Sequence, residues 1–220
     1  MIEQIRKRIE YEEFDYQTLM NCLDGYSRPR DKISDLLRKK DIVRIKKGLY
    51  IFGDNYRRRP YSREILANLI YGPSYISLEY ALHYYGLIPE RVEAVTSVTS
   101  GRSRRFFTPA GLFVYRKISL KAFQTGMDMI EIEGERSFLI ATPGKALADK
   151  IRDDRGTGVK TQRELQTYLV ENLRVDQEAL LVLNPERLDE YAERYHSRKV
   201  KLLADLVRRL RSREEGIAHA

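Results

Sequence analysis

Basic side chains and hydroxyl groups gather between residues 27 and 59, and these are the groups that bind the phosphates and base edges of a nucleic acid. The candidate DNA-binding residues are Ser27, Arg28, Arg30, Lys32, Ser34, Arg38, Lys39, Arg44, Lys46, Lys47, Arg57, Arg58 and Arg59. Two carboxylates, Asp31 and Asp35, lie among them and would repel phosphate. They could orient neighbouring cations through i, i+4 pairs, accept a hydrogen bond from cytosine, or leave only the start of this segment to touch DNA.

A helix over residues 29–40 is predicted to position most of these side chains. Ser27 is the expected N-cap, and Pro29 suits the first turn, where its missing N–H would have no partner anyway. Apolar residues at i, i+3 and i+4 form one stripe, which places the charged residues on the opposite face. The stripe consists of Ile33, Leu36 and Leu37. Alternation then replaces the helical period over residues 42–52, with a turn at Lys47-Gly48, so a basic hairpin is expected.

A helix followed by a basic hairpin is the layout of a winged helix-turn-helix, in which the helix enters the major groove and the hairpin lies against the phosphates. A basic amphipathic helix alone is more often a solvated surface, and a helical cap on an enzyme is the alternative for this half of the chain. The hairpin cations, and the three arginines at 57–59 directly behind them, favour nucleic acid over both alternatives.

The composition restricts the classes of protein and partner. The chain has 220 residues, 42% of them hydrophobic, which is enough for a core and suggests two small domains. The net charge of +8 makes an acidic polymer the natural partner, with nucleic acid first. A membrane surface is disfavoured because the chain has no Trp, and there is no apolar run long enough to span a bilayer.

Cysteine usage and the charged N-terminus lead us to expect a cytoplasmic protein. Cys22 is the only cysteine, so a disulfide within the chain and a thiol zinc site are both excluded. The first fourteen residues are charged throughout and do not read as a signal peptide.

The predicted organisation is a DNA-binding domain at 1–56, a linker at 57–60, a second domain at 61–213 and a frayed tail at 214–220. Helices are expected over 2–11 and 14–23 in the first domain. In the second, helices at 62–70 and 77–85 precede strands at 92–98 and 112–118, separated by a loop at 101–105. A hairpin around Gly134 is expected over 127–141, with its second arm as a central strand. Helices follow over 143–153, 161–172 and 177–182, from Pro185 onward, and over 198–211.

Several ordered motifs resemble the AbiEi family of antitoxins from type IV toxin–antitoxin operons. They are the basic hairpin at 44–50, GPSYISLEYAL at 72–82, YGLIPE at 85–90, VTSVT at 95–99, the strand at 111–115 and TPGKALAD at 142–149. The likeness covers about half of the chain well and its ends loosely.

The resemblance implies an α+β fold, with an N-terminal winged helix-turn-helix followed by a mixed α/β antitoxin domain that has a small sheet and a helical C-terminal part. It also implies binding to inverted repeats in the protein's own promoter, repression of the operon, and neutralisation of a nucleotidyltransferase-like toxin. Whether neutralisation needs direct contact with the toxin is left open. A second hypothesis is a protein-interaction module that acts mainly on the toxin, with DNA binding secondary.

A nucleic-acid-processing enzyme is the third and least favoured hypothesis, and neither a metal nor a cofactor is expected. The three histidines are scattered, and Gly144-Lys145 lacks the spacing and the hydroxyl of a phosphate loop. Carboxylates could imitate a two-metal site, but a solvated acidic end opposite Lys145, Lys150 and Arg152 is preferred. These carboxylates are Glu131, Glu133, Asp149, Asp153 and Asp154.

Two further basic regions are candidates for binding. Arg102, Arg104 and Arg105 stand beside Phe106-Phe107, which suits nucleic-acid contacts or an acidic toxin surface equally. The last helix carries a third set: Arg198, Lys199, Lys201, Arg208, Arg209 and Arg211. Glu79, within the 77–85 helix, is expected to be solvated or to pair with an arginine such as Arg102.

Overall fold

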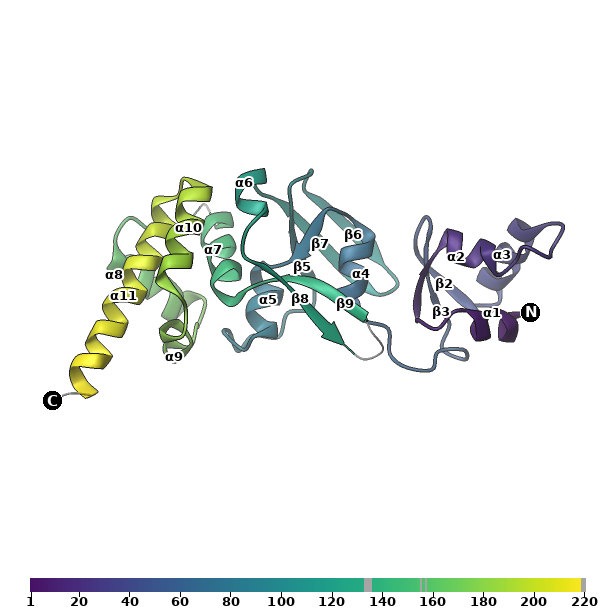
Figure 1. The fold of residues 1–220 in the computed structure, drawn as a ribbon, viewed down its shortest axis with the longest axis horizontal. Helices are drawn as coiled ribbons and strands as arrows, with labels where there is room; N and C mark the ends of the chain where they lie inside the picture. Colours follow the sequence, from purple (N-terminus) through teal and green to yellow (C-terminus); the bar gives the residue numbers. More distant parts are fainter. Residues whose placement is uncertain (133–135, 155, 157, 219–220) are drawn as a thin grey trace.

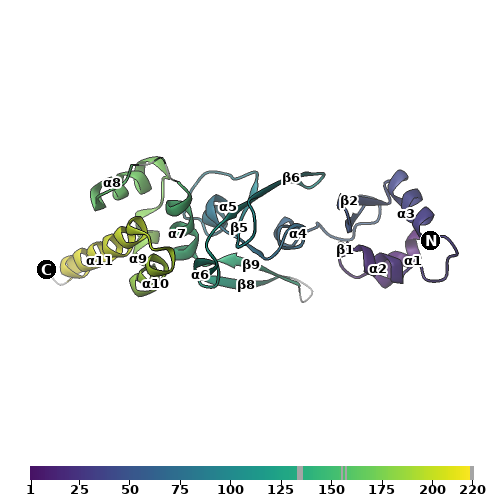
Figure 2. The same cartoon turned by 90° about the horizontal axis from the view of Figure 1, so that it is seen from above.

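The computed structural model describes residues 1–132, 136–154, 156 and 158–218, with side chains described up to residue 214. The fold is α+β with two separate sheets, and the α+β class is therefore confirmed. Figures 1 and 2 show an elongated molecule, in which a small N-terminal module, a central sheet and a helical C-terminal part follow one another from one end to the other.

The N-terminal module has the element order helix, strand, two helices and two strands. These are α1 (Ile2–Arg8), β1 (Glu13–Asp15), α2 (Tyr16–Asn21), α3 (Pro29–Arg38), β2 (Ile42–Lys46) and β3 (Leu49–Phe52). The strands form an antiparallel sheet in the order β1-β3-β2. One face of this sheet packs on the helices through a core that includes Leu19, Leu36 and Phe52.

The first helix, expected over 2–11, ends at Arg8, and two further predictions about this module are wrong. The helix expected to begin at Phe14 begins at Tyr16, because residues 13–15 pair with β3 and Asp15 accepts a hydrogen bond from the Thr18 amide. Ser27 is not the N-cap of α3: Arg28 holds that position, and no side chain caps the helix. The hairpin with its turn at Lys47-Gly48 is confirmed.

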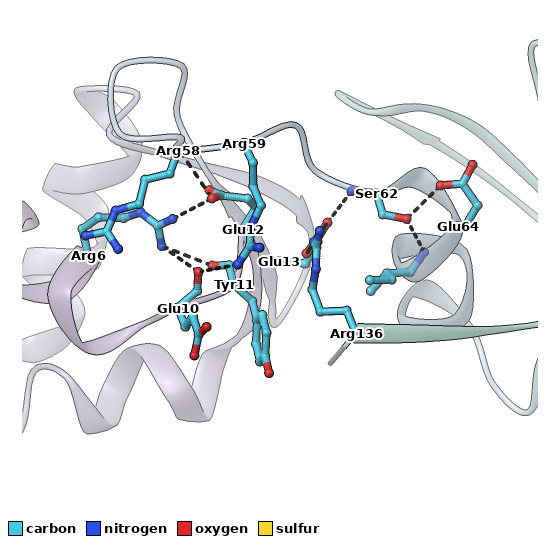
Figure 3. A network of polar contacts seen from close by, with 11 residues as sticks. Arg6, Glu10, Tyr11, Glu12, Glu13, Arg58, Arg59, Ser62, Glu64 and Arg136 are labelled. Atoms are coloured by element: carbon cyan, nitrogen blue, oxygen red, sulfur yellow. Dashed lines mark hydrogen bonds and ion pairs between the residues drawn. The ribbon is translucent and has the colours of Figure 1, made fainter. Parts of the chain in front are cut away.

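The outer face of the small sheet is covered by the rest of the molecule. Ile45, Leu49 and Ile51 belong to the same continuous hydrophobic cluster as the helix α4 (Arg63–Ile70). The buried carboxylate of Glu13 accepts hydrogen bonds from the Ser62 amide and, at 3.1 Å, from Arg136 (Figure 3). Both apolar and polar contacts therefore hold the module against the central part.

The central sheet has the strand order β6-β7-β5-β4-β9-β8. Its strands are β4 (Ser74–Ile76), β5 (Val95–Thr99), β6 (Arg104–Thr108), β7 (Gly111–Lys117), β8 (Met127–Ile132) and β9 (Arg136–Ala141). β5 runs parallel to β7 and β4 parallel to β9, while the other neighbours are antiparallel. β9 is an interior strand, as predicted. The predicted Gly134 turn lies outside the described residues.

Helices cover both faces of this sheet. On one face, the Tyr115 hydroxyl donates to the carbonyl of Ala67 in α4 at 2.6 Å. On the other, the Tyr80 amide of α5 (Leu78–Tyr84) donates to Thr96 at 3.0 Å, and Lys145 of α7 (Pro143–Asp153) lies over the Tyr75 ring. The short helix α6 (Leu120–Phe123) follows β7.

Two strands of the central sheet differ from expectation. β4 was not predicted, and the expected loop at 101–105 is wrong at its end, since Arg104 and Arg105 begin β6. β4 has only three residues and β6 is largely exposed, so the hydrophobic pattern of neither sequence identifies it as a strand. They exist because β5 and β7 offer backbone partners from elsewhere in the chain.

The C-terminal helices pack on α7 and on one another. They are α8 (Gln162–Thr167), a π-helical turn (Tyr168–Asn172), α9 (Gln177–Leu181), α10 (Pro185–Tyr195) and α11 (Arg198–Ala218). Thr161 and Glu164 form a capping box at the start of α8. The last helix runs to Ala218, beyond the predicted end at 211 and through most of the expected frayed tail. No helix in the described ranges has the length and apolar character needed to cross a membrane.

Candidate nucleic-acid interface

The helix α3 lies on the side of the N-terminal module that is turned away from the central sheet (Figures 1 and 2), and its polar side chains are mostly exposed. The buried stripe of Ile33 and Leu36 turns these side chains outward, because the two residues anchor the helix on the small sheet. The exposed candidates on or beside α3 are Ser27, Arg28, Arg30, Ser34, Arg38 and Lys39. Most of the predicted helix residues therefore share one accessible surface.

Local contacts decide how these side chains are presented. Arg38 pairs with Asp35 at 2.8 Å, so this carboxylate orients a cation, through an i, i+3 pair rather than the expected i, i+4 pair. Lys32 is half-buried, with its ammonium group 5.7 Å from the centre of the Tyr26 ring. No side chain caps the start of α3, so its first backbone N–H groups have no side-chain acceptor and can donate to an anion.

The hairpin divides its cations between two sides. Arg44 and Lys47 are exposed, and the Arg44 guanidinium lies 6.0 Å from the Tyr50 ring centre. A register shift between Arg44 and Lys46 turns Lys46 toward the central part, where its ammonium group donates to the carbonyl of Ile70. Burial there lowers the pKa of Lys46. Lys46 is thus engaged within the molecule, unlike the phosphate contact expected from alternation.

Arg57, Arg58 and Arg59 form a separate group. Arg57 donates to Asp54 and lies over the Tyr61 ring, at 5.0 Å from its centre. The Arg58 amide donates to Glu12 at 3.3 Å, and Arg59 reaches the carbonyl of Glu10 at 3.5 Å (Figure 3).

Arg58 and Arg59 thus contact the residues just before β1, at the sheet edge opposite β2, whereas Arg57 contacts its own segment. The cations from 28 to 59 therefore lie in two places. One group is on α3 and the hairpin, and the other is the segment at 57–59, which follows the hairpin. We refer to the exposed residues Arg28, Arg30, Arg38, Lys39, Arg44 and Lys47 as the α3–hairpin surface.

The second basic region lies on the edge strand β6. Arg102, Arg104 and Arg105 are exposed, and Phe107 is 82% exposed. β6 pairs only with β7 in the described sheet, so its other backbone edge is open. Aromatic and basic side chains are therefore presented together, as the sequence predicts.

The third basic set, on the last helix, is mostly engaged within the molecule, although Arg198 and Lys201 are exposed. Arg208 and Lys201 pair with Asp189, and these contacts lower the pKa of Asp189 against the opposing effect of burial. Arg209 donates to Gln166, and Arg211 donates to the carbonyl of Leu181. Lys201, Arg208, Arg209 and Arg211 thus join the last helix to α8, α9 and α10.

The expected solvated acidic end of α7 is wrong for Asp149, although Asp153 at the last turn is exposed. Lys145 is completely buried and Asp149 is 1% exposed, and the two are ion-paired. Asp149 also accepts hydrogen bonds from Ser77 at 2.6 Å and Tyr195 at 2.5 Å. Burial lowers the pKa of Lys145 and raises that of Tyr195. The three buried apolar residues between the pair, Ala146 to Ala148, are the sequence signal that this helix is enclosed on all sides.

Glu79 pairs with Lys150 at 2.7 Å, and not with Arg102. Burial alone would lower the pKa of Lys150, but the carboxylates of Glu79 and Asp154 together raise it above the usual value. Within the described residues, no three His, Cys, Asp or Glu side chains are arranged to hold a metal ion, and Glu133 lies outside that set.

Comparison with known proteins adds no family: neither the protein-family models nor the curated proteins contain a match to this chain.

Proposed function

We propose that the N-terminal module is a winged helix that binds duplex DNA through the α3–hairpin surface. Two observations support this best: the cations of that surface are exposed, and α3 lies on the side of the module that is turned away from the central sheet (Figure 1). A helix followed directly by a two-stranded hairpin is the arrangement in which winged helices reach a groove and the flanking phosphates.

In the proposed complex, α3 enters the major groove with its N-terminal turns first. The uncapped backbone N–H groups and Arg28 and Arg30 face the phosphates there, while Arg44 and Lys47 hold the neighbouring backbone. Lys46 is left out of this contact because Ile70 already accepts its hydrogen bond.

The resemblance to AbiEi antitoxins extends the proposal to the whole chain. We infer that the protein is a cytoplasmic autorepressor that binds inverted repeats in its own promoter and counteracts a nucleotidyltransferase-like toxin, and that it is not itself an enzyme. The closed surroundings of Asp149 support the last point, since its oxygens already accept bonds from Lys145, Ser77 and Tyr195.

A mobility-shift titration with the protein's own upstream region tests the DNA-binding proposal. Selective binding over an unrelated duplex is expected, together with a large loss when Arg30, Arg44 and Lys47 are replaced by alanine. The matched control replaces Arg163, Arg187 and Arg198, three exposed arginines of the C-terminal part, and changes the net charge equally. Equal losses in the two triple variants would contradict a dedicated surface.

A second candidate function is direct docking of the toxin on β6. The 82% exposure of Phe107 beside Arg104 and Arg105, on an open strand edge, favours a protein partner with an acidic, apolar surface. Replacing these three side chains by alanine in the full chain is expected to abolish neutralisation of the toxin and leave operator binding unchanged. Neutralisation at the wild-type level would rule out this surface.

A further inference from the structure

A cavity of about 260 Å³ opens where α5, α7 and α10 meet the carboxyl ends of the parallel strands β5 and β7. Val98 and Arg116 come from these strands, and Ile118 and Ser119 follow β7 directly. The carboxyl end of parallel strands is the place where open α/β sheets bind ligands. None of the DNA-binding residues proposed above lines this cavity.

The floor of the cavity is a closed, electrically balanced cluster. Asp149 lines it, but Lys145 neutralises this carboxylate from behind, and the Ser77 and Tyr195 hydroxyls donate to it. A cation would therefore find no available charge at the floor, which argues against a metal site.

The rim of the cavity is positive. Arg116 and Arg152 line it, together with the carboxylate of Asp153, whereas Lys117, the next residue after Arg116 in β7, directs its side chain to the other face of the sheet. Arg116 approaches Asp153 at 3.5 Å, with side-chain exposures of 42% and 37%, so the pair is loose and open to solvent. Loose pairs of this kind are worth little and exchange readily for a better acceptor. An anionic group would thus be attracted to the mouth.

The walls of the cavity add apolar surface and one of the four described residues other than glycine that have a positive φ. Half-buried Ile118 contributes accessible aliphatic carbon, and Leu78 and Val98, which are 2% and 0% exposed, line the cavity as part of the core. Leu78 also has a φ of +59°, which is unfavourable for a residue other than glycine. Such conformations persist only where the surrounding structure holds them, and they cluster at ligand sites.

We propose that this cavity binds a small anionic ligand, with a phosphate or carboxylate group at the Arg116–Arg152 rim and a short apolar body against Ile118. The volume lies below the range typical for drug-sized ligands, so the occupant has few non-hydrogen atoms. The proposal does not depend on DNA binding, because the cavity and the α3–hairpin surface share no residue.

Isothermal titration of the full chain with phenyl phosphate, benzoate and neutral benzamide tests this proposal, and the two anions separate phosphate from carboxylate recognition. At least one anion is expected to bind about ten-fold more tightly than benzamide, since a charge-assisted hydrogen bond strengthens binding by about that factor or more. Inorganic phosphate is expected to bind more weakly than phenyl phosphate, because it leaves the apolar walls unused.

The variant Arg116→Gln with Arg152→Gln is expected to weaken anion binding at least about ten-fold. The matched control, Arg104→Gln with Arg105→Gln, changes the charge equally on β6 and is expected to have no effect. In the wild-type chain, the amide resonances of Ile118 and Ser119 are expected to shift on titration, which keeps the test valid if the first variant fails to fold. Binding of benzamide as tight as that of the anions, equal losses in both variants, or unshifted resonances would overturn the proposal.

Discussion

Replacing Asp149 with alanine tests how the C-terminal half is held together. The carboxylate joins three elements, because it binds Lys145 on its own helix, Ser77 at the end of β4 and Tyr195 at the end of α10. Its removal leaves the Lys145 ammonium group fully buried, with the Tyr195 hydroxyl at 3.2 Å and the faces of two tyrosine rings as its remaining neighbours.

The expected loss is large because a buried charge without its counter-ion is more costly than the absence of the whole pair. Breaking a buried ion pair destabilises a protein by about 3–5 kcal/mol. A domain is stable by about 5–15 kcal/mol in total, so this is a large part of the free energy of unfolding. At about 2–4 °C per kcal/mol for a chain of this size, Tm should fall by roughly 10 °C.

Urea and thermal unfolding followed by circular dichroism measure this change. The double variant Lys145→Met with Asp149→Leu should recover most of the loss, since apolar residues of similar volume often replace buried pairs at little cost. Arg91→Ala, which breaks an exposed pair with Glu93, serves as the surface control and should leave Tm unchanged. The reasoning is refuted if Asp149→Ala is as harmless as Arg91→Ala, or if the double variant is no better than the single one.

Two further predictions concern alkaline pH and the contact between the module and the central part. Burial raises the pKa of seven tyrosines above the usual value of 10: Tyr75, Tyr80, Tyr85, Tyr115, Tyr168, Tyr191 and Tyr195. The folded state keeps these protons while the unfolded state releases them, so the urea midpoint should fall as pH rises above about 10, and a constant midpoint would contradict this. Glu13→Gln should weaken the contact with Arg136 and accelerate tryptic cleavage at 57–59, whereas the exposed control Glu10→Gln should not; equal cleavage of both variants would count against the contact.

The sequence predicts best the elements whose signals are local. Pro29, the apolar stripe and the Lys47-Gly48 turn are all close to the structure they determine, so α3 and its hairpin come out nearly correct. The strand β1 was missed because its three residues depend on β3, which lies more than thirty positions away. Without that partner, the residues around Phe14 have no pattern that distinguishes a strand from the start of a helix.

Charged residues are where the sequence misleads most. Lys46 and Lys47 are adjacent and chemically identical, yet only Lys47 is exposed, since a register shift turns its neighbour toward Ile70. Lys145 and Asp149 have the spacing of an ordinary surface pair on a helix. Their burial results from the sheet on one side and α10 on the other, and neither is visible in the local sequence.

The salt dependence of operator binding tests the central claim most directly. Each phosphate contact contributes about 0.9 to the slope of log K against log salt concentration. If Arg30, Arg44 and Lys47 each contact a phosphate, replacing all three with alanine should reduce the slope by roughly 2.7. The control triple at Arg163, Arg187 and Arg198 should leave the slope at the wild-type value. An unchanged slope in the first variant, or an equal reduction in both, would show that the α3–hairpin surface is not where this protein meets DNA.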